Sequence, residues 1–81
     1  MMATVRLLYF ASLREATGCD GETVDSDAPD LAALYAETAA RHGLAWPRER
    51  LRVAADGAFA RWSDPLRDGG EVAFIPPVSG G

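Results

Sequence analysis

The sequence predicts an α+β domain in which one main helix packs against a mixed five-stranded sheet. Three observations support this fold class. Residues 3–10 and 71–75 alternate apolar side chains with the period of an extended strand. Residues 31–42 repeat apolar side chains at spacings of three and four, which is typical of a helix with one buried face. Asp56-Gly57 is a dipeptide favoured in two-residue hairpin turns.

The first strand is predicted over residues 3–10. Val5, Leu7 and Tyr9 fall on one side of an extended chain, so we expect them to point into the core. Phe10 then falls on the opposite side, together with the other even-numbered residues. Residues 11–18 are predicted to form a helical turn, and residues 22–25 a short returning strand.

The main helix is predicted between two recognisable ends. Asp30 follows a proline and is a plausible N-cap, because its side chain can accept a hydrogen bond from a free N–H of the first turn. Gly43 supplies a residue that tolerates the left-handed conformation in which many helices end.

The second half of the chain predicts three further strands. Residues 51–55 and 58–62 flank the Asp56-Gly57 turn, and residues 71–75 form the closing strand. The prolines that follow have no backbone N–H and should end its hydrogen bonding. The order of elements fits a β-grasp (ubiquitin-like) roll, with residues 1–76 as the domain and residues 77–81 as an extended, flexible C-terminal tail.

Composition narrows the functional classes. The chain has 81 residues, enough for one modest core, and a net charge of −4, which disfavours nucleic acid as a partner. Cys19 and His42 are the only residues of their kinds, so we expect no internal disulfide, no metal site and no chemistry from either. No apolar run is long enough for a membrane span and the start does not resemble a signal peptide, so we expect a cytoplasmic protein.

An apolar docking face is predicted where the closing strand ends. If Val72 and Phe74 point into the core, Ile75 points outward. The first and last strands of a β-grasp fold are parallel neighbours, which would bring Ile75 next to Phe10, and Phe59 could extend the patch. A register error of one residue would instead bury these side chains in the core.

Two long motifs give the chain a family resemblance. YFASLRE at residues 9–15 and LRDGGEVAFIPPVSGG at residues 66–81, with the hairpin between them, resemble the small subunit family of molybdopterin synthase (MoaD), which belongs to the ubiquitin-like ThiS/MoaD sulfur carriers. The resemblance covers nearly the whole chain. One departure is Asp56, where relatives commonly have asparagine, and an acidic residue suits the same turn.

The resemblance implies a defined cycle. An E1-like (MoeB-like) enzyme would use ATP and Mg²⁺ to adenylate the carboxylate of Gly81, and sulfur would then replace AMP. The thiocarboxylate would enter the active site of the large (MoaE-like) subunit, within a heterotetramer, and sulfurate a pterin precursor. The chain would bind no cofactor itself and would be a sulfurtransferase subunit that is not catalytic alone.

The same resemblance assigns roles to residues around the tail. Gly80 would accompany Gly81 at the reacting end, and Arg14 could pair with an acidic group on a partner or be an ordinary solvated charge. The residues expected to contact partners are Phe10, Arg14, Phe59, Ile75, Pro76, Pro77, Val78 and Ser79.

The tail also suits this chemistry on physical grounds. Glycine at both final positions leaves no side chain to obstruct a narrow channel, and Pro76 and Pro77 restrict the direction in which the tail leaves the sheet. Residues 78–81, fully extended, would reach about 13 Å beyond the prolines. Three alternatives share the fold: a ThiS-type carrier for thiazole synthesis, a ubiquitin-like protein modifier, and a non-catalytic binding module with an inert tail. The absence of lysine weakens the idea of lysine-linked chains of this molecule.

Overall fold

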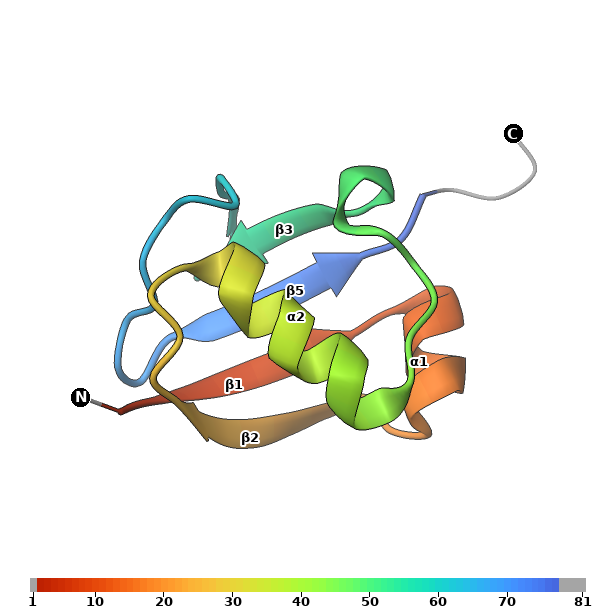
Figure 1. Cartoon of the computed structure of the whole chain (residues 1–81), viewed down its shortest axis with the longest axis horizontal. Helices are drawn as coiled ribbons and strands as arrows, with labels where there is room; N and C mark the ends of the chain where they lie inside the picture. The colour runs from red at the N-terminus through yellow and green to blue at the C-terminus, as the bar shows by residue number, and fades with distance from the viewer. Residues whose placement is uncertain (1, 78–81) are drawn as a thin grey trace.

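The computed structural model describes residues 2–77 and contains five strands and two α-helices over that range (Figure 1). Strand β1 is followed by a short helix α1, strand β2 and the main helix α2. A 3₁₀ turn, η1, then leads into the last three strands. The bounds are β1 Ala3–Tyr9, α1 Ala11–Thr17, β2 Gly21–Ser26, α2 Leu31–His42, η1 Arg48–Arg50, β3 Arg52–Ala55, β4 Ala58–Phe59 and β5 Glu71–Ile75.

The strands form one mixed sheet in the order β2-β1-β5-β3-β4. Strands β1 and β5 are parallel neighbours, whereas the β1–β2, β3–β5 and β3–β4 pairs are antiparallel. Helix α2 lies across one face of the sheet (Figure 1). This arrangement is the β-grasp roll that the sequence predicts. It places the first and last strands of the chain, β1 and β5, side by side in the interior of the sheet.

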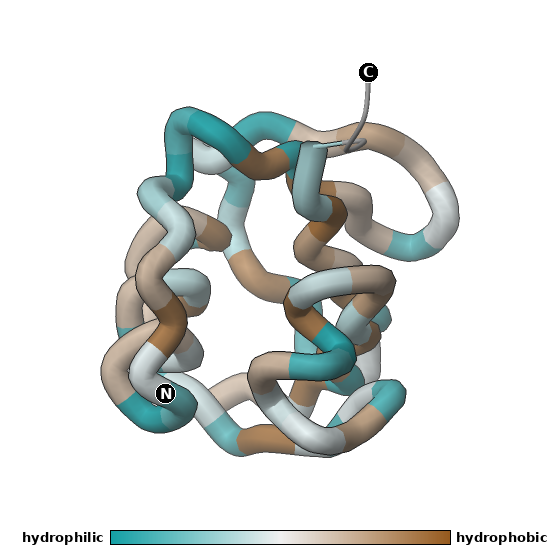
Figure 2. Tube along the Cα trace, turned by 90° about the vertical axis from the view of Figure 1, so that its right-hand side faces the viewer, coloured by the Kyte–Doolittle hydropathy of each residue, from teal (hydrophilic) through white to brown (hydrophobic). Residues whose placement is uncertain are grey.

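The core lies between α2 and the inner face of the sheet. The predicted inward faces are confirmed, because the three residues of β1 predicted to point inward (Val5, Leu7 and Tyr9) and the two of β5 (Val72 and Phe74) are buried. Figure 2 shows that hydrophobic (brown) and hydrophilic (teal) residues are interspersed along the chain. The buried cluster comprises Val5, Leu7, Tyr9, Leu13, Leu31, Leu34, Tyr35, Leu51, Val53, Val72 and Phe74.

Helix α2 begins and ends where the sequence predicts. The Asp30 carboxylate accepts a hydrogen bond from the backbone N–H of Ala33 at 2.8 Å, and Gly43 ends the helix in the left-handed region with φ 66°. The backbone N–H groups of Leu31 and Ala32 donate hydrogen bonds to the carbonyls of Asp64 and Trp62 respectively, each at 2.9 Å. The loop after β4 therefore completes the cap of α2 and fixes its start over the sheet.

The hairpin after β3 turns as predicted but is shorter. Asp56 and Gly57 both have positive φ (52° and 87°). A two-residue hairpin turn whose twist matches that of the flanking strands requires positive φ at both positions. The predicted strand over residues 58–62 is wrong beyond Phe59, because the chain then leaves the sheet. Trp62 crosses to the core side and stacks on Phe74, with ring centroids 6.1 Å apart, so aromatic packing ends the strand.

Candidate functional site: an apolar face beside the C-terminal segment

The outer face of the sheet carries an apolar hollow of about 300 Å³ next to the end of β5. Side chains from β1, β3, β4 and β5 line it, because neighbouring strands present the same face at each register position. Ile75 lies on the opposite face of β5 from the buried Val72 and Phe74, as predicted. Ala73 lines the hollow on the same outer side, although only 9% of its surface is exposed. The lining residues are Leu8, Phe10, Ala54, Gly57, Phe59, Glu71, Ala73 and Ile75.

Two large aromatic side chains of this face are open to solvent. Phe10 is 46% exposed and Phe59 is 70% exposed, and the only other exposed large hydrophobic residue within residues 2–77 is Met2. The prediction that these aromatics lie outside the core is therefore confirmed, including for Phe59. Contiguous exposed apolar surface on a small domain marks a site of interaction.

Backbone geometry contributes to the position of Phe10. Phe10 is the N-cap of α1, and Ala11 directly after it has φ 51°, a conformation that costs free energy for a residue with a side chain. Strand β1 consequently ends at Tyr9, one residue earlier than predicted. The tight turn lets Phe10 lie on the outer face while Leu13 of α1 is fully buried.

The C-terminal segment, Pro76-Pro77, leaves the sheet between two further hollows. One, of about 370 Å³, is lined by residues of η1 and β3, and the other, of about 510 Å³, by Phe10 and the first residues of α1. Ile75, Pro76 and Pro77 line both. Pro76 is buried against the domain and Pro77 is exposed. The predicted contact residues Val78 and Ser79, and the predicted reacting residues Gly80 and Gly81, lie outside the described residues.

Arg14 lies on helix α1, within the helical turn that the sequence predicts over residues 11–18. Its side chain is 57% exposed, and its Nε atom is 3.9 Å from a carboxylate oxygen of Asp20. Arg14 is not among the residues that line the hollow beside α1, although Ser12 and Glu15 are. The structure thus groups Phe10, Phe59 and Ile75 closely and leaves Arg14 at the periphery.

A polar cluster fixes the end of β1 from the core side. One carboxylate oxygen of Glu22 accepts hydrogen bonds from the Tyr9 hydroxyl at 2.5 Å, from His42 Nε2 at 2.6 Å and from Arg41 at 3.3 Å. Burial alone would raise the pKa of Glu22, but the hydrogen bonds from Tyr9 and His42 and the charge of Arg41 lower it below its ordinary value. Burial, together with the adjacent carboxylate, raises the pKa of Tyr9. The ionised carboxylate therefore joins β1, β2 and the last turn of α2.

The sequence alone does not predict this polar cluster. Glu22 lies on the inward side of an edge strand, and His42 is 20 residues away at the end of α2. The His42 side chain is partly buried, and its acceptor follows from the tertiary structure alone. An inward-pointing charge on an edge strand is also one way in which proteins discourage edge-to-edge pairing.

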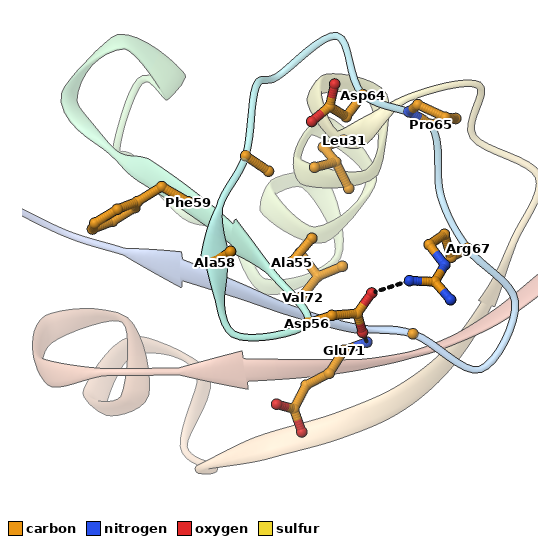
Figure 3. A pocket seen from close by; sticks show the side chains of 12 residues that line it. Leu31, Ala55, Asp56, Ala58, Phe59, Asp64, Pro65, Arg67, Glu71 and Val72 are labelled. Atoms are coloured by element: carbon orange, nitrogen blue, oxygen red, sulfur yellow. Dashed lines mark hydrogen bonds and ion pairs between the residues drawn. The ribbon is translucent and has the colours of Figure 1, made fainter.

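A separate hollow of about 340 Å³ lies where β5 begins, at the end of that strand opposite the C-terminal segment (Figure 3). The Asp56 carboxylate accepts a hydrogen bond from the backbone N–H of Glu71 at 3.0 Å and pairs with Arg67 at 3.1 Å. In Figure 3 the Phe59 ring points away from Leu31, on the far side of this hollow. Asp56 therefore joins the hairpin to the start of β5, while Phe59 belongs to the docking face.

Within residues 2–77, no group of three or more His, Cys, Asp or Glu side chains could hold a metal ion. No helix in the same range has the length and apolar character needed to cross a bilayer. The thiol of Cys19 is half-buried, 3.8 Å from the hydroxyl of Thr17.

The fold and the site define a ubiquitin-like β-grasp protein with an apolar face next to its C-terminal segment. The chain matches the ThiS family over residues 7–81 and belongs to that family. It is 40% identical to the molybdopterin synthase sulfur carrier subunit of Escherichia coli (strain K12), over 95% of this chain and 99% of the relative.

Solved structures agree with this assignment. SAMP1 from Haloferax volcanii superposes with a TM-score of 0.82 at 25% identity, covering 98% of this chain and 100% of that one. The complex of subunits 1 and 2 of the molybdopterin-converting factor from Helicobacter pylori 26695 contains a chain that matches with a TM-score of 0.63 at 28% identity, with full coverage of both chains.

Proposed function

We propose that this chain is the sulfur carrier subunit of molybdopterin synthase and that it works through the carboxylate of Gly81. The observation that carries the proposal is the position of the apolar face, which adjoins the segment leading to the C-terminal diglycine. A partner that covers Phe10, Phe59 and Ile75 would receive the end of the chain at a defined place. The 40% identity to the Escherichia coli sulfur carrier subunit supports the same function.

The chemistry requires activation, because a carboxylate is a poor electrophile at neutral pH. An E1-like enzyme with ATP and Mg²⁺ would convert the Gly81 carboxylate into an acyl adenylate and release pyrophosphate. A sulfur nucleophile would then attack the carbonyl carbon and displace AMP, leaving a thiocarboxylate. Sulfur in that form is a nucleophile that needs no general base, as for an activated cysteine thiolate. Because activation uses ATP, we place it in the cytoplasm.

The acceptor of this sulfur would be a pterin precursor in the active site of the large subunit. The Helicobacter pylori complex of subunits 1 and 2 supports a large-subunit partner. Catalytic acids and bases for this step would come from that partner, and the present chain would supply the sulfur, the docking face and the tail. Pro76 and Pro77 would limit the entropy lost when the tail enters the partner.

Mass spectrometry of the intact chain tests the proposal. Incubation with an E1-like adenylating enzyme, ATP, Mg²⁺ and a sulfide source should add the mass of one oxygen-to-sulfur exchange, located at Gly81. The matched control lacks Gly81 and should gain no such mass while keeping its affinity for the large subunit. A wild-type chain that gains no sulfur, with an activating enzyme shown to adenylate its own carrier, would contradict the proposal.

A second function is favoured by the likeness to SAMP1, a small archaeal modifier protein. The same activated Gly81 could be transferred to an amine of another protein instead of to sulfur. Because this chain has no lysine, such conjugates would carry single copies and not lysine-linked chains. Antibody detection of conjugates that vanish in the Gly81-deleted strain would show this role, and sulfur transfer alone would produce none.

A further inference from the structure

A short basic strip borders the apolar face where the C-terminal segment leaves the domain. Residues 48–52 contain three arginines and one glutamate, a net charge of +2 in a chain whose net charge is −4. Arg50 and Arg52 line the same hollow as Phe59, Ile75 and the two prolines. Positive charge is therefore concentrated at this edge of a molecule that is otherwise acidic.

Arg52 is held on the outer face by two contacts. It is opposite Ile75 in the β3–β5 pairing, and its guanidinium is 5.4 Å from the centroid of the Phe59 ring. A cation over an aromatic face is favourable and restricts the side chain. Arg52 consequently presents its charge beside the exposed aromatic ring and not away from it.

The strip is also short of negative partners within the domain. Glu49 is 3.9 Å from Arg48, whose guanidinium lies 6.0 Å from the ring of Trp62. Across residues 2–77 no carboxylate forms an ion pair with Arg50 or Arg52. Both arginines are exposed, so their hydrogen-bond donors are available to a docking protein.

We propose that Arg50 and Arg52 pair with an acidic rim on the large subunit and thereby set the orientation and rate of docking. This inference rests on the proposed function, because it takes the large subunit as the occupant of the apolar face. The acidic group must lie at the rim and not along the tail's path, since the C-terminal carboxylate or thiocarboxylate is itself negative. The partner surface thus needs acidic groups beside the hollow that Arg50 and Arg52 line, and none where the tail enters the partner.

Rim charges act mainly on association. Opposite charges steer the encounter and penalise wrong registers, whereas most of the affinity comes from the buried apolar centre. The effect weakens with salt, because the Debye length falls from about 10 Å at 0.1 M to about 3 Å at 1 M. Arg50 and Arg52 should therefore govern the salt dependence of the association rate, and Phe59 the dissociation rate.

Stopped-flow or surface-binding kinetics with the cognate large subunit measures these effects. Arg52→Glu should lower the association rate constant by roughly tenfold at about 50 mM salt and by less than about twofold at about 1 M. Arg52→Gln, which carries less risk to the fold, should give an intermediate loss. Arg61→Glu makes the same change of charge in the loop that caps α2, and it should leave the rate within about twofold of wild type.

The absence of lysine allows a direct test of the contact. Arg52→Lys introduces the single side-chain amine of the molecule, so a carbodiimide can join it only to a carboxylate in direct contact. In the complex with the large subunit this variant should give one cross-link that wild type lacks, which peptide mass spectrometry assigns to Lys at position 52 and an Asp or Glu of the partner. Arg61→Lys is the matched control and should give none, and wild type corrects for the N-terminal amine.

The outcomes separate this inference from the proposed function. If wild type fails to bind the large subunit, the proposed function fails. If wild type binds but Arg52→Glu changes neither the rate nor its salt dependence, the inference is overturned and the function stands. Sedimentation of the free chain tests whether a second copy of this chain covers the strip instead. A wild-type dimer that Arg52→Glu converts to monomer would assign the strip to self-association and would likewise overturn the inference.

Discussion

Replacement of Phe59 by alanine should weaken docking while leaving the domain stable. Phe59 lies on the two-residue strand β4 and is 70% exposed in the free chain. A phenylalanine side chain offers on the order of 200 Å² of surface, so roughly 140 Å² of Phe59 is available to a partner. At about 25 cal/mol per Å² this sets an upper limit of about 3.5 kcal/mol.

The expected loss is smaller than that limit. Alanine keeps the β-carbon and neighbouring side chains can close part of the gap, so we expect a loss of about 2 kcal/mol, or about thirtyfold in Kd for the large subunit. The free energy of unfolding should fall by less than about 1 kcal/mol, because Phe59→Ala removes only the contact with Arg52 and partial packing.

Calorimetric titration gives the Kd, and urea unfolding gives the stability. The contrasting variant is Phe74→Ala, since Phe74 is fully buried beneath the same face and its loss should cost about 3–5 kcal/mol of unfolding free energy. A Phe59→Ala variant that loses more than about 2 kcal/mol of stability, or that binds within threefold of wild type, would refute the assignment of Phe59 to the docking face.

Three further changes test other parts of the structure. Because folding lowers the pKa of Glu22, its ionised form stabilises the fold above its ordinary pKa of 4.5, and this contribution is lost as the pH falls through the lower folded-state pKa. The free energy of unfolding of Glu22→Gln should be about 1–2 kcal/mol below that of wild type at pH 7. The two values should converge in acid, as a pH series of urea titrations would show. Asp56→Ala should cost about 1–2 kcal/mol, because alanine tolerates φ 52° poorly and leaves the N–H of Glu71 without its acceptor, whereas Asp56→Asn should stay within about 0.5 kcal/mol of wild type in the same assay. Gly21→Ala would place a β-carbon 2.5 Å from the carbonyl oxygen of Leu7, so β2 must shift, and a fall in Tm matching about 1–3 kcal/mol is expected; an unchanged Tm would show that this edge strand yields freely.

Local signals along the chain were sufficient for most of the fold. Alternation in residues 3–10 and 71–75 correctly separated inward from outward side chains, because the period of a strand is a local property of the backbone. Asp30 and Gly43 correctly marked the ends of α2, since a cap depends on the few residues around it. The Asp56-Gly57 turn was predicted for the same reason.

The extent of β4 needed more than local signals. Residues 58–62 have the composition of a strand, yet only Ala58–Phe59 pair with β3. The chain leaves the sheet because Trp62 stacks against Phe74, a contact between residues 12 apart whose outcome depends on how the whole core packs. Strand propensity is weak enough for such packing to override it.

The order of residues along the chain thus determines the strand alternation, the helix caps and the hairpin turn. Which side chains become neighbours across the molecule depends on the register between strands that are far apart in sequence. That register brings Phe10, Phe59 and Ile75 to one face and places Arg52 beside Phe59. It also lets Tyr9 and His42 share a single carboxylate oxygen of Glu22. These long-range contacts form only when the apolar faces of the helix and the sheet are buried together, so no local pattern can specify them.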